Sequence, residues 1–171
     1  MTITFILGGA DSGKSVYAEN LANQNINNYE KKIYLATAPA IDDEMKKRIK
    51  LHQKRRDDSW VTIEEEVFIS RIIEEKSSIE NILLIECLTT WLSNLIYKKI
   101  HYNNELKVLT NTLYKQKSDI IVVSNELGHS IIPENKLSRE FRTINGKMNQ
   151  AIAKIADNVI FVIAGYGQKI K

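Results

Sequence analysis

The chain has 171 residues, is 43% hydrophobic and 26% charged, and so does not have the composition of a disordered or fibrous protein. Its net charge of +3 is too small to demand nucleic acid or a membrane surface as partner. The single cysteine, Cys87, excludes an internal disulfide and fits a reducing compartment. No apolar stretch approaches the roughly 20 residues of a membrane span, and no targeting segment is visible. We therefore expect a cytoplasmic protein with a single domain over residues 1–171.

Short apolar runs rich in β-forming residues recur along the chain. They cover residues 3–7, 32–36, 81–85, 120–124 and 159–164. Several are apolar at consecutive positions, which is typical of parallel strands that are buried on both faces. Helical patterns lie between them, and strands that alternate with helices indicate βαβ units. The sequence therefore predicts an α/β fold with a mostly parallel central sheet flanked by helices.

Two of the predicted helices have clear signals. One is expected over residues 42–55, because three acidic residues stand in its first turn, where they favour the positive end of the helix dipole. The other is the last helix, with Pro133 near its start, where a missing N–H does no harm. Its predicted apolar stripe consists of Leu137, Phe141, Ile144, Met148, Ile152 and Ile155.

A glycine-rich segment matches the phosphate-binding pattern G-x-x-x-x-G-K-[ST] in full. It reads Gly8, Gly9, Ala10, Asp11, Ser12, Gly13, Lys14 and Ser15. A predicted strand precedes it and a helix over about residues 15–22 follows, as this motif requires. Glycines let backbone N–H groups face an anion, and the helix N-terminus adds partial positive charge. We expect Lys14 to reach the β- and γ-phosphates of a nucleoside triphosphate and Ser15 to bind Mg²⁺.

An acidic residue at a strand end usually completes the metal site of a phosphate-loop protein. Glu86 directly follows the run 81–85 and is the first candidate, and Glu126 after the run 120–124 is a second. An ordinary surface carboxylate at the end of a strand is the alternative for either residue.

A histidine between arginines forms a second group of interest. On a helix, Arg48 lies four residues before His52 and Arg55 three residues after it, so the three share one face. Such a histidine can act as general base, phosphate ligand or nucleophile, and nearby cations disfavour its protonation. A solvated basic helix face with an incidental histidine has the same spacing. The pattern by itself leaves both interpretations open.

Further polar residues follow the run 120–124, at the edge where α/β proteins bind ligands. They are Asn125, Glu126, Gly128 and His129. Arg139 and Arg142 lie off the apolar stripe of the last helix, so they either contact phosphate or are simply solvated. Cys87 is expected to be a buried, small apolar residue and not a nucleophile.

Four blocks of sequence, spread in order over nearly the whole chain, carry a family resemblance. They are the doubled-glycine phosphate loop, residues 34–38 with 42–45 and 48–52, residues 84–91, and residues 123–126 continuing through 132–135, 141–142 and 149–150 to 165–167. On these blocks the chain resembles the bifunctional adenosylcobinamide kinase/adenosylcobinamide-phosphate guanylyltransferases of cobalamin biosynthesis.

The resemblance implies a RecA-like phosphate-loop fold, often assembled as a homotrimer, and two reactions. ATP or GTP phosphorylates the aminopropanol hydroxyl of adenosylcobinamide, and GMP from GTP is then transferred to that phosphate with release of pyrophosphate. The family's guanylylated histidine falls on His52. Its nucleotide contacts fall on the loop Gly8 to Ser15 and on Ala36, Thr37, Ala38, Gln53, Lys54, Arg55, Arg56, Glu64 and Glu86.

Asp11 departs from the family pattern, because arginine is usual at this position of the phosphate loop. A carboxylate there is expected to weaken triphosphate affinity or to pair with a nearby base. Two alternative functions stand beside the bifunctional enzyme. One is a small-molecule phosphate-loop kinase in which His52 only binds phosphate, and the other is a non-catalytic nucleotide-binding switch.

Overall fold

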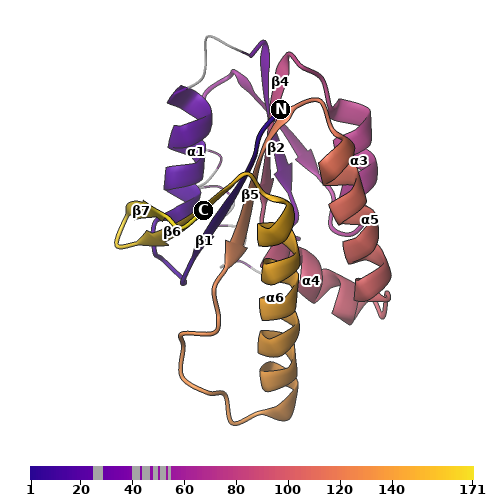
Figure 1. Cartoon of the computed structure of the whole chain (residues 1–171), viewed down its shortest axis with the longest axis vertical. Coiled ribbons are helices and arrows are strands. Elements are labelled where there is room, and N and C mark those ends of the chain that lie inside the picture. The colour runs from indigo at the N-terminus through magenta and orange to yellow at the C-terminus, as the bar shows by residue number, and fades with distance from the viewer. Residues whose placement is uncertain (25–28, 40–42, 44–46, 48–49, 51–52, 54) are drawn as a thin grey trace.

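The computed structural model describes residues 1–24, 29–39, 43, 47, 50, 53 and 55–171. The strands within these ranges are β1 (Ile3–Gly8), β2 (Lys31–Ala36), β3 (Trp60–Glu64), β4 (Asn81–Glu86), β5 (Asp119–Asn125), β6 (Asn158–Ile163) and β7 (Tyr166–Lys169). The helices are α1 (Lys14–Gln24), α3 (Ile69–Lys76), α4 (Leu88–Tyr97), α5 (Tyr102–Lys115) and α6 (Lys136–Ile155) (Figure 1).

All seven strands belong to one sheet, in the order β3-β2-β4-β5-β1-β6-β7. Neighbouring strands are parallel except β6 and β7, which form an antiparallel hairpin. Strand β1 lies between β5 and β6, with its last residue Gly8 in register with Asn125. The segments that follow β1, β2, β4 and β5 therefore leave the sheet at the same edge, where α/β proteins place their ligands. The predicted α/β fold with a mostly parallel sheet is confirmed.

Helices cover both faces of the sheet (Figure 1). Because successive strand residues point to opposite faces, each buried strand supplies two cores. Phe5, Leu35 and Val122 pack with the apolar sides of α3, α4, α5 and α6. On the opposite face, Ile6, Leu84 and other strand residues pack with Ala18 and Ala22 of α1. Burial on both faces explains the continuous apolar runs that predicted these strands.

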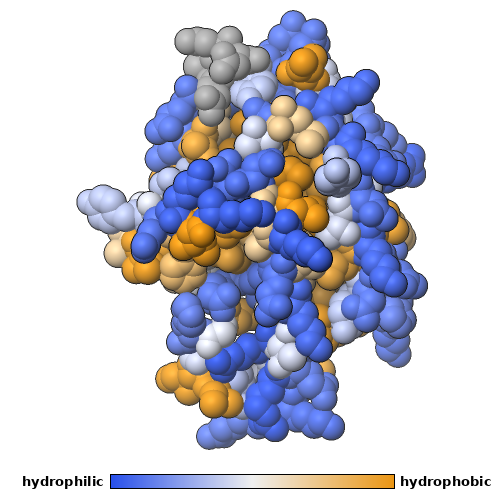
Figure 2. All heavy atoms as spheres, viewed as in Figure 1, coloured by the Kyte–Doolittle hydropathy of each residue, from blue (hydrophilic) through white to orange (hydrophobic). Residues whose placement is uncertain are grey.

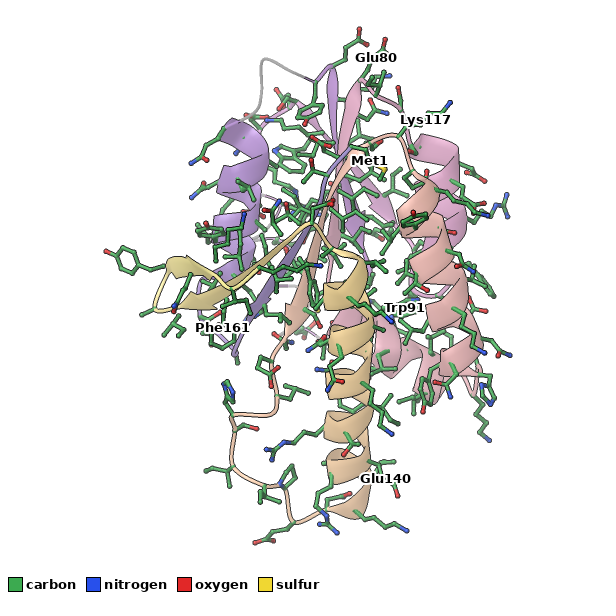
Figure 3. All side chains as sticks on the ribbon, viewed as in Figure 1. Met1, Glu80, Trp91, Lys117, Glu140 and Phe161 are labelled. Atoms are coloured by element: carbon green, nitrogen blue, oxygen red, sulfur yellow. The ribbon has the colours of Figure 1, made fainter. Side chains whose placement is uncertain are left out.

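Trp91 anchors the larger of the two cores (Figure 3). It lies on α4, is 1% exposed, and its indole N–H donates a hydrogen bond of 2.7 Å to the carbonyl oxygen of Val67. The bond satisfies the polar atom of a large side chain that is otherwise surrounded by apolar groups. Trp91 therefore ties α4 to the segment that leads into α3.

Helix α6 differs in part from its prediction. It begins at Lys136, and the side chain of Asn135 caps it by accepting from the N–H groups of Leu137 and Ser138, at 2.8 and 3.3 Å, so Pro133 lies outside the helix. Met148 and Ile152 are buried as predicted, but Leu137 is 66% exposed. The reason is that the first turns of α6, which include Glu140, extend beyond the sheet (Figures 1 and 3). An apolar patch lies at this end of the molecule (Figure 2).

Two strands were not predicted, because they lack a continuous apolar run. Strand β3 is buried only at Trp60, and every residue of β7 is exposed. Both lie at the edges of the sheet, where one side of the strand has no neighbour. Along the predicted helix 42–55, the described residues Asp43, Lys47, Lys50, Gln53 and Arg55 are helical, and the other positions lie outside the described residues. None of the helices that the structure describes combines the length and apolarity needed to cross a bilayer.

Candidate functional site

The phosphate-loop motif connects the interior strand β1 to the N-terminus of α1. Its backbone takes positive φ values at Asp11 (52°) and at Gly13 (89°). A Cβ atom on Gly13 would lie 2.9 Å from the Cα atom of Gly165, closer than real Cβ contacts come. The N–H of Gly165 donates a hydrogen bond of 2.8 Å to the carbonyl oxygen of Ser12. The loop after β6 therefore braces the phosphate loop, and the brace requires glycine at position 13.

Lys14 is the first residue of α1 and is only 5% exposed. Its ammonium group donates a hydrogen bond of 3.0 Å to the carbonyl oxygen of Gly9, so the side chain folds back over the loop. The hydroxyl oxygen of Ser12 is buried and has no hydrogen-bond partner among the described residues. Asp11 is exposed. A helix N-terminus, an ammonium group and a glycine-rich loop at one place form an arrangement suited to anions.

Ser15 and Glu86 meet at the carboxyl edge of the sheet. The Ser15 hydroxyl donates a hydrogen bond to one carboxylate oxygen of Glu86, and the Tyr34 hydroxyl donates to the other at 3.2 Å. A hydroxyl beside a carboxylate is a set of hard oxygen donors of the kind that Mg²⁺ takes when phosphates and water complete its shell. Within the described ranges, no group of three or more His, Cys, Asp or Glu residues could hold a metal ion. Glu126 instead accepts a hydrogen bond from the N–H of Gly128 in its own loop.

The segment after β2 is tied to the segment after β4. Thr37 is fully buried, and its hydroxyl accepts from the N–H of Cys87 and donates to the carbonyl oxygen of Cys87, both at 2.9 Å. The N–H of Thr37 donates to the carbonyl oxygen of Glu86 at 3.0 Å. Thr37 therefore holds Glu86 in place. Cys87 is half-buried and not fully buried as predicted, but the burial of its thiol raises the pKa of that group, which agrees with its prediction as a non-nucleophilic residue.

The other residues of this group lie farther toward solvent. Ala36 ends β2, Ala38 is half-buried, and Glu64 is exposed at the end of the edge strand β3, in register with Ala36. Gln53 is exposed. His52, Arg48 and Lys54 lie outside the described residues. The structure thus places the phosphate loop, Glu86 and residues 36–38 at the carboxyl edge of the sheet, and Glu64 lies at the same edge.

Arg55 and Arg56 converge on Glu19, a buried carboxylate of α1. The Nε atom of Arg55 lies 3.1 Å from Oε2 of Glu19, and Nη1 of Arg56 lies 3.6 Å from Oε1. The guanidinium carbon of Arg56 also lies 3.6 Å from the ring centroid of Tyr34, as a cation–π contact. Charged and polar contacts therefore run without interruption from Arg55 through Glu19, Arg56 and Tyr34 to Glu86.

Burial dominates the proton equilibria of this group. It raises the pKa of Glu19, an effect that Glu86 adds to and that Arg55 and Arg56 oppose. Burial and the negative charge of Glu86 raise the pKa of Tyr34 well above its usual value, so the hydroxyl stays protonated and keeps donating to Glu86.

The polar residues after β5 form a separate set of contacts. The side-chain amides of Asn145 and Asn149 donate to the carbonyl oxygen of Asn125, at 2.9 and 3.1 Å. Arg142 donates to the carbonyl oxygen of Gly128. These contacts attach α6 to the end of β5 and to the loop that follows it.

The remaining two candidates of this region also contact protein groups. Arg139 donates to the carbonyl oxygen of Pro133 at 3.0 Å and to that of Glu134. The exposed ring of His129 meets the ring of Phe161 edge-on, with 5.8 Å between centroids. Both arginines bind backbone carbonyls of the loop, and Arg139 is exposed while Arg142 is half-buried. Contact with phosphate stays a prediction for both residues.

Glu19 and Tyr34 are parts of this site to which the sequence assigned no role. Glu19 stands four residues after Ser15, so the two share a face of α1, and this spacing was the available signal. Tyr34 stands two residues before Ala36 on β2, so both face the α1 side of the sheet, where Tyr34 packs in the smaller core. Neither spacing reveals that Arg55 and Arg56 come to the same place.

Comparison with solved structures supports the fold. The flagellar accessory protein FlaH from Methanocaldococcus jannaschii matches with a TM-score of 0.53 and 15% identity, over 99% of this chain and 78% of that chain. The KaiC-like protein PH0186 from Pyrococcus horikoshii OT3 matches with a TM-score of 0.53 and 14% identity, over 94% of this chain and 70% of that chain. With the observed strand order, these matches confirm the RecA-like phosphate-loop fold.

Comparison of sequences identifies the family. Proteins named bifunctional adenosylcobalamin biosynthesis protein CobU, from Escherichia coli and Salmonella typhimurium, are 33% and 34% identical over 97% of this chain and 98% of the relative. The protein of Pseudomonas aeruginosa named bifunctional adenosylcobalamin biosynthesis protein CobP is 38% identical over 97% of this chain and 95% of the relative. The family described as cobinamide kinase / cobinamide phosphate guanyltransferase matches residues 4–170. The chain therefore belongs to the cobinamide kinase / cobinamide phosphate guanyltransferase family of enzymes.

Proposed function

We propose that this enzyme phosphorylates adenosylcobinamide with ATP or GTP and then transfers GMP from GTP to adenosylcobinamide phosphate through a guanylylated His52. The products of the second step are adenosyl-GDP-cobinamide and pyrophosphate. Family membership supports both activities. The observation in the structure that carries the proposal is the pairing of Arg55 and Arg56 with Glu19 on α1. These arginines follow His52 by three and four residues, and α1 begins at the phosphate loop.

In the kinase step, the phosphate loop binds the triphosphate through its backbone N–H groups and Lys14. Ser15 and Glu86 would hold Mg²⁺, which neutralises charge on the β- and γ-phosphate oxygens when it is bound. The substrate hydroxyl oxygen bonds to the γ-phosphorus, the bond to the β-phosphate oxygen breaks, and the nucleoside diphosphate leaves. The hydroxyl proton passes to solvent. The chain's main contribution to this step is positioning and charge.

In the guanylyltransferase step, a neutral imidazole nitrogen of His52 attacks the α-phosphorus of GTP. A P–N bond forms, the bond from the α-phosphorus to the bridging oxygen breaks, and pyrophosphate leaves. An oxygen of the corrinoid phosphate then attacks the same phosphorus, the P–N bond breaks, and the imidazole is restored. Two displacements of this kind replace one difficult transfer.

The proposal assigns nucleotide contacts to the same residues that the family resemblance implies. They are Gly8, Gly9, Ala10, Asp11, Ser12, Gly13, Lys14, Ser15, Ala36, Thr37, Ala38, Gln53, Lys54, Arg55, Arg56, Glu64 and Glu86. It also includes a homotrimeric assembly, which the resemblance supports. The proposed location is the cytoplasm, because a single cysteine fits a reducing compartment.

The position of a radioactive label in GTP tests the proposal. Wild-type protein with Mg²⁺ should acquire covalent label from α-labelled GTP and not from γ-labelled GTP. The variant His52→Ala should acquire none, and the matched variant His101→Ala, which removes an exposed histidine, should be labelled like wild type. Adenosylcobinamide phosphate should then remove the label from the protein.

Two outcomes would contradict the proposal. If the γ-phosphoryl group is transferred to adenosylcobinamide but no α-label binds to the protein, the protein is a small-molecule kinase without guanylyltransferase activity. Binding of GTP with neither transfer would leave a nucleotide-binding switch.

A further inference from the structure

Glu19, Arg55 and Arg56, here called the Glu19 clasp, join two segments that are far apart in the sequence. Glu19 is 4% exposed, and the side chain of Arg56 is 5% exposed. A carboxylate buried to this extent without a cation would be costly, and removing one member of such a group leaves the other charge uncompensated. The clasp therefore holds residues 55–56 against the middle of α1.

The clasp is held by charge and stacking together. Arg55 and Glu19 are within hydrogen-bonding distance, at 3.1 Å. Arg56 and Glu19 are 3.6 Å apart, and among the described residues the facing atoms Nη1 and Oε1 have no hydrogen-bond partner. The Tyr34 ring supports the Arg56 guanidinium from the side of the sheet. The negative charge of Glu19 is thus the element that both arginines share.

A second contact holds the chain directly after the clasp. The ammonium group of the buried Lys32 lies 3.8 Å from a carboxylate oxygen of Asp57, and it donates a hydrogen bond of 2.8 Å to Asn23 of α1. Lys32 also lies 5.3 Å from the ring centroid of Trp60, the first residue of β3. From residue 55 to residue 60 the chain is therefore attached to both α1 and β2.

These attachments limit the reach of the residues that precede them. Arg55 follows His52 by three residues, and three residues span at most about 11 Å. Glu19 lies one turn after Ser15 on the same helix, so the clasp and the phosphate-loop end of α1 belong to one rigid element. Arg55 and Arg56 are therefore fixed to the helix that has the phosphate loop at its start.

We propose that Glu19 is a positioning residue for guanylyl transfer, because it fixes Arg55 and Arg56, which follow His52 by three and four residues in the sequence, on the helix that begins at the phosphate loop. The inference rests on the function proposed above. The kinase step does not use His52, so Glu19 should matter for guanylylation and much less for γ-phosphoryl transfer.

The test compares Glu19→Gln, which keeps the size of the side chain and removes its charge, with wild type. The rate of protein labelling by saturating α-labelled GTP should fall about 10- to 100-fold, the effect of a misplaced reacting group. The KM for GTP should rise as well, because Arg55 and Arg56 are proposed nucleotide contacts, but the rate of adenosylcobinamide phosphorylation at saturating ATP should change by less than about threefold. Hydrogen exchange should become faster in peptides that cover residues 50–58 and stay unchanged in peptides from α1. Glu19→Asp, which keeps the charge, should recover part of the labelling rate.

The matched control is Glu75→Gln, which removes the carboxylate from an exposed Arg71–Glu75 pair of 2.8 Å and should leave every rate unchanged. If Glu19→Gln is labelled at the wild-type rate, this inference is wrong, while the proposed function still stands. A joint loss of labelling, phosphorylation and GTP binding, with faster exchange in α1, would also overturn it, because Glu19 would then only maintain the helix. Absence of label from wild-type protein would overturn the proposed function, and this inference with it.

Discussion

Replacing Gly13 by alanine tests the bracing of the phosphate loop. The residue has a φ of 89°, which costs an L-residue about 1–2 kcal/mol. The new Cβ would lie 2.9 Å from the Cα atom of Gly165, so one of the two loops must shift. That shift strains the 2.8 Å hydrogen bond from Gly165 to Ser12, which is worth about 0.5–1.5 kcal/mol. Together these effects should lower the free energy of unfolding by about 2–3 kcal/mol.

Urea denaturation measures this change directly, as a lower midpoint with an unchanged slope. For a chain of this length, the melting temperature should fall by about 5–10 °C. Nucleotide affinity should fall as well, because the displaced loop carries the anion-binding N–H groups. Gly146→Ala is the matched control: the residue lies within α6, a Cβ added there would meet nothing within 4 Å, and alanine should stabilise by about 0.5–1 kcal/mol. A Gly13→Ala protein as stable as wild type would refute the reasoning.

Two further predictions concern side-chain hydrogen bonds. Trp91→Phe keeps most of the buried ring but leaves the carbonyl oxygen of Val67 without its donor, so the free energy of unfolding in urea should fall by about 1–3 kcal/mol; an unchanged midpoint would contradict this. Burial and the hydrogen bond to Asp119 raise the pKa of Tyr29 to about 12, so the unfolded chain loses this proton near pH 10 while the folded chain keeps it. Stability should therefore decline as pH rises from about 10 to about 12, and Tyr29→Phe should decline less steeply in thermal melts over that range. Parallel curves for the two proteins would show that Tyr29 is not responsible.

The sequence predicted most clearly those features whose residues all lie within one short segment of the chain. The phosphate loop could be recognised because its glycines, Lys14 and Ser15 lie within eight consecutive residues, and the buried strands because parallel strands are apolar on both faces. The weak signals belonged to the sheet edges: β3 and β7 are largely exposed, so nothing in their composition required a strand. Leu137 was wrongly predicted to be buried for a related reason, since helical periodicity does not reveal where the sheet beneath a helix ends.

The sequence by itself determined the α/β class, the phosphate loop and two candidate carboxylates at strand ends, Glu86 and Glu126. Each of these depends on residues adjacent in the chain or on one strand. Only the tertiary structure decided that Ser15 donates to Glu86 and not to Glu126, since Glu126 accepts a hydrogen bond within its own loop, from the N–H of Gly128. It also decided that Glu19 is buried between Arg55 and Arg56. A charge on a helix is expected to be solvated until another segment covers it, and that covering is a long-range contact that no local pattern encodes.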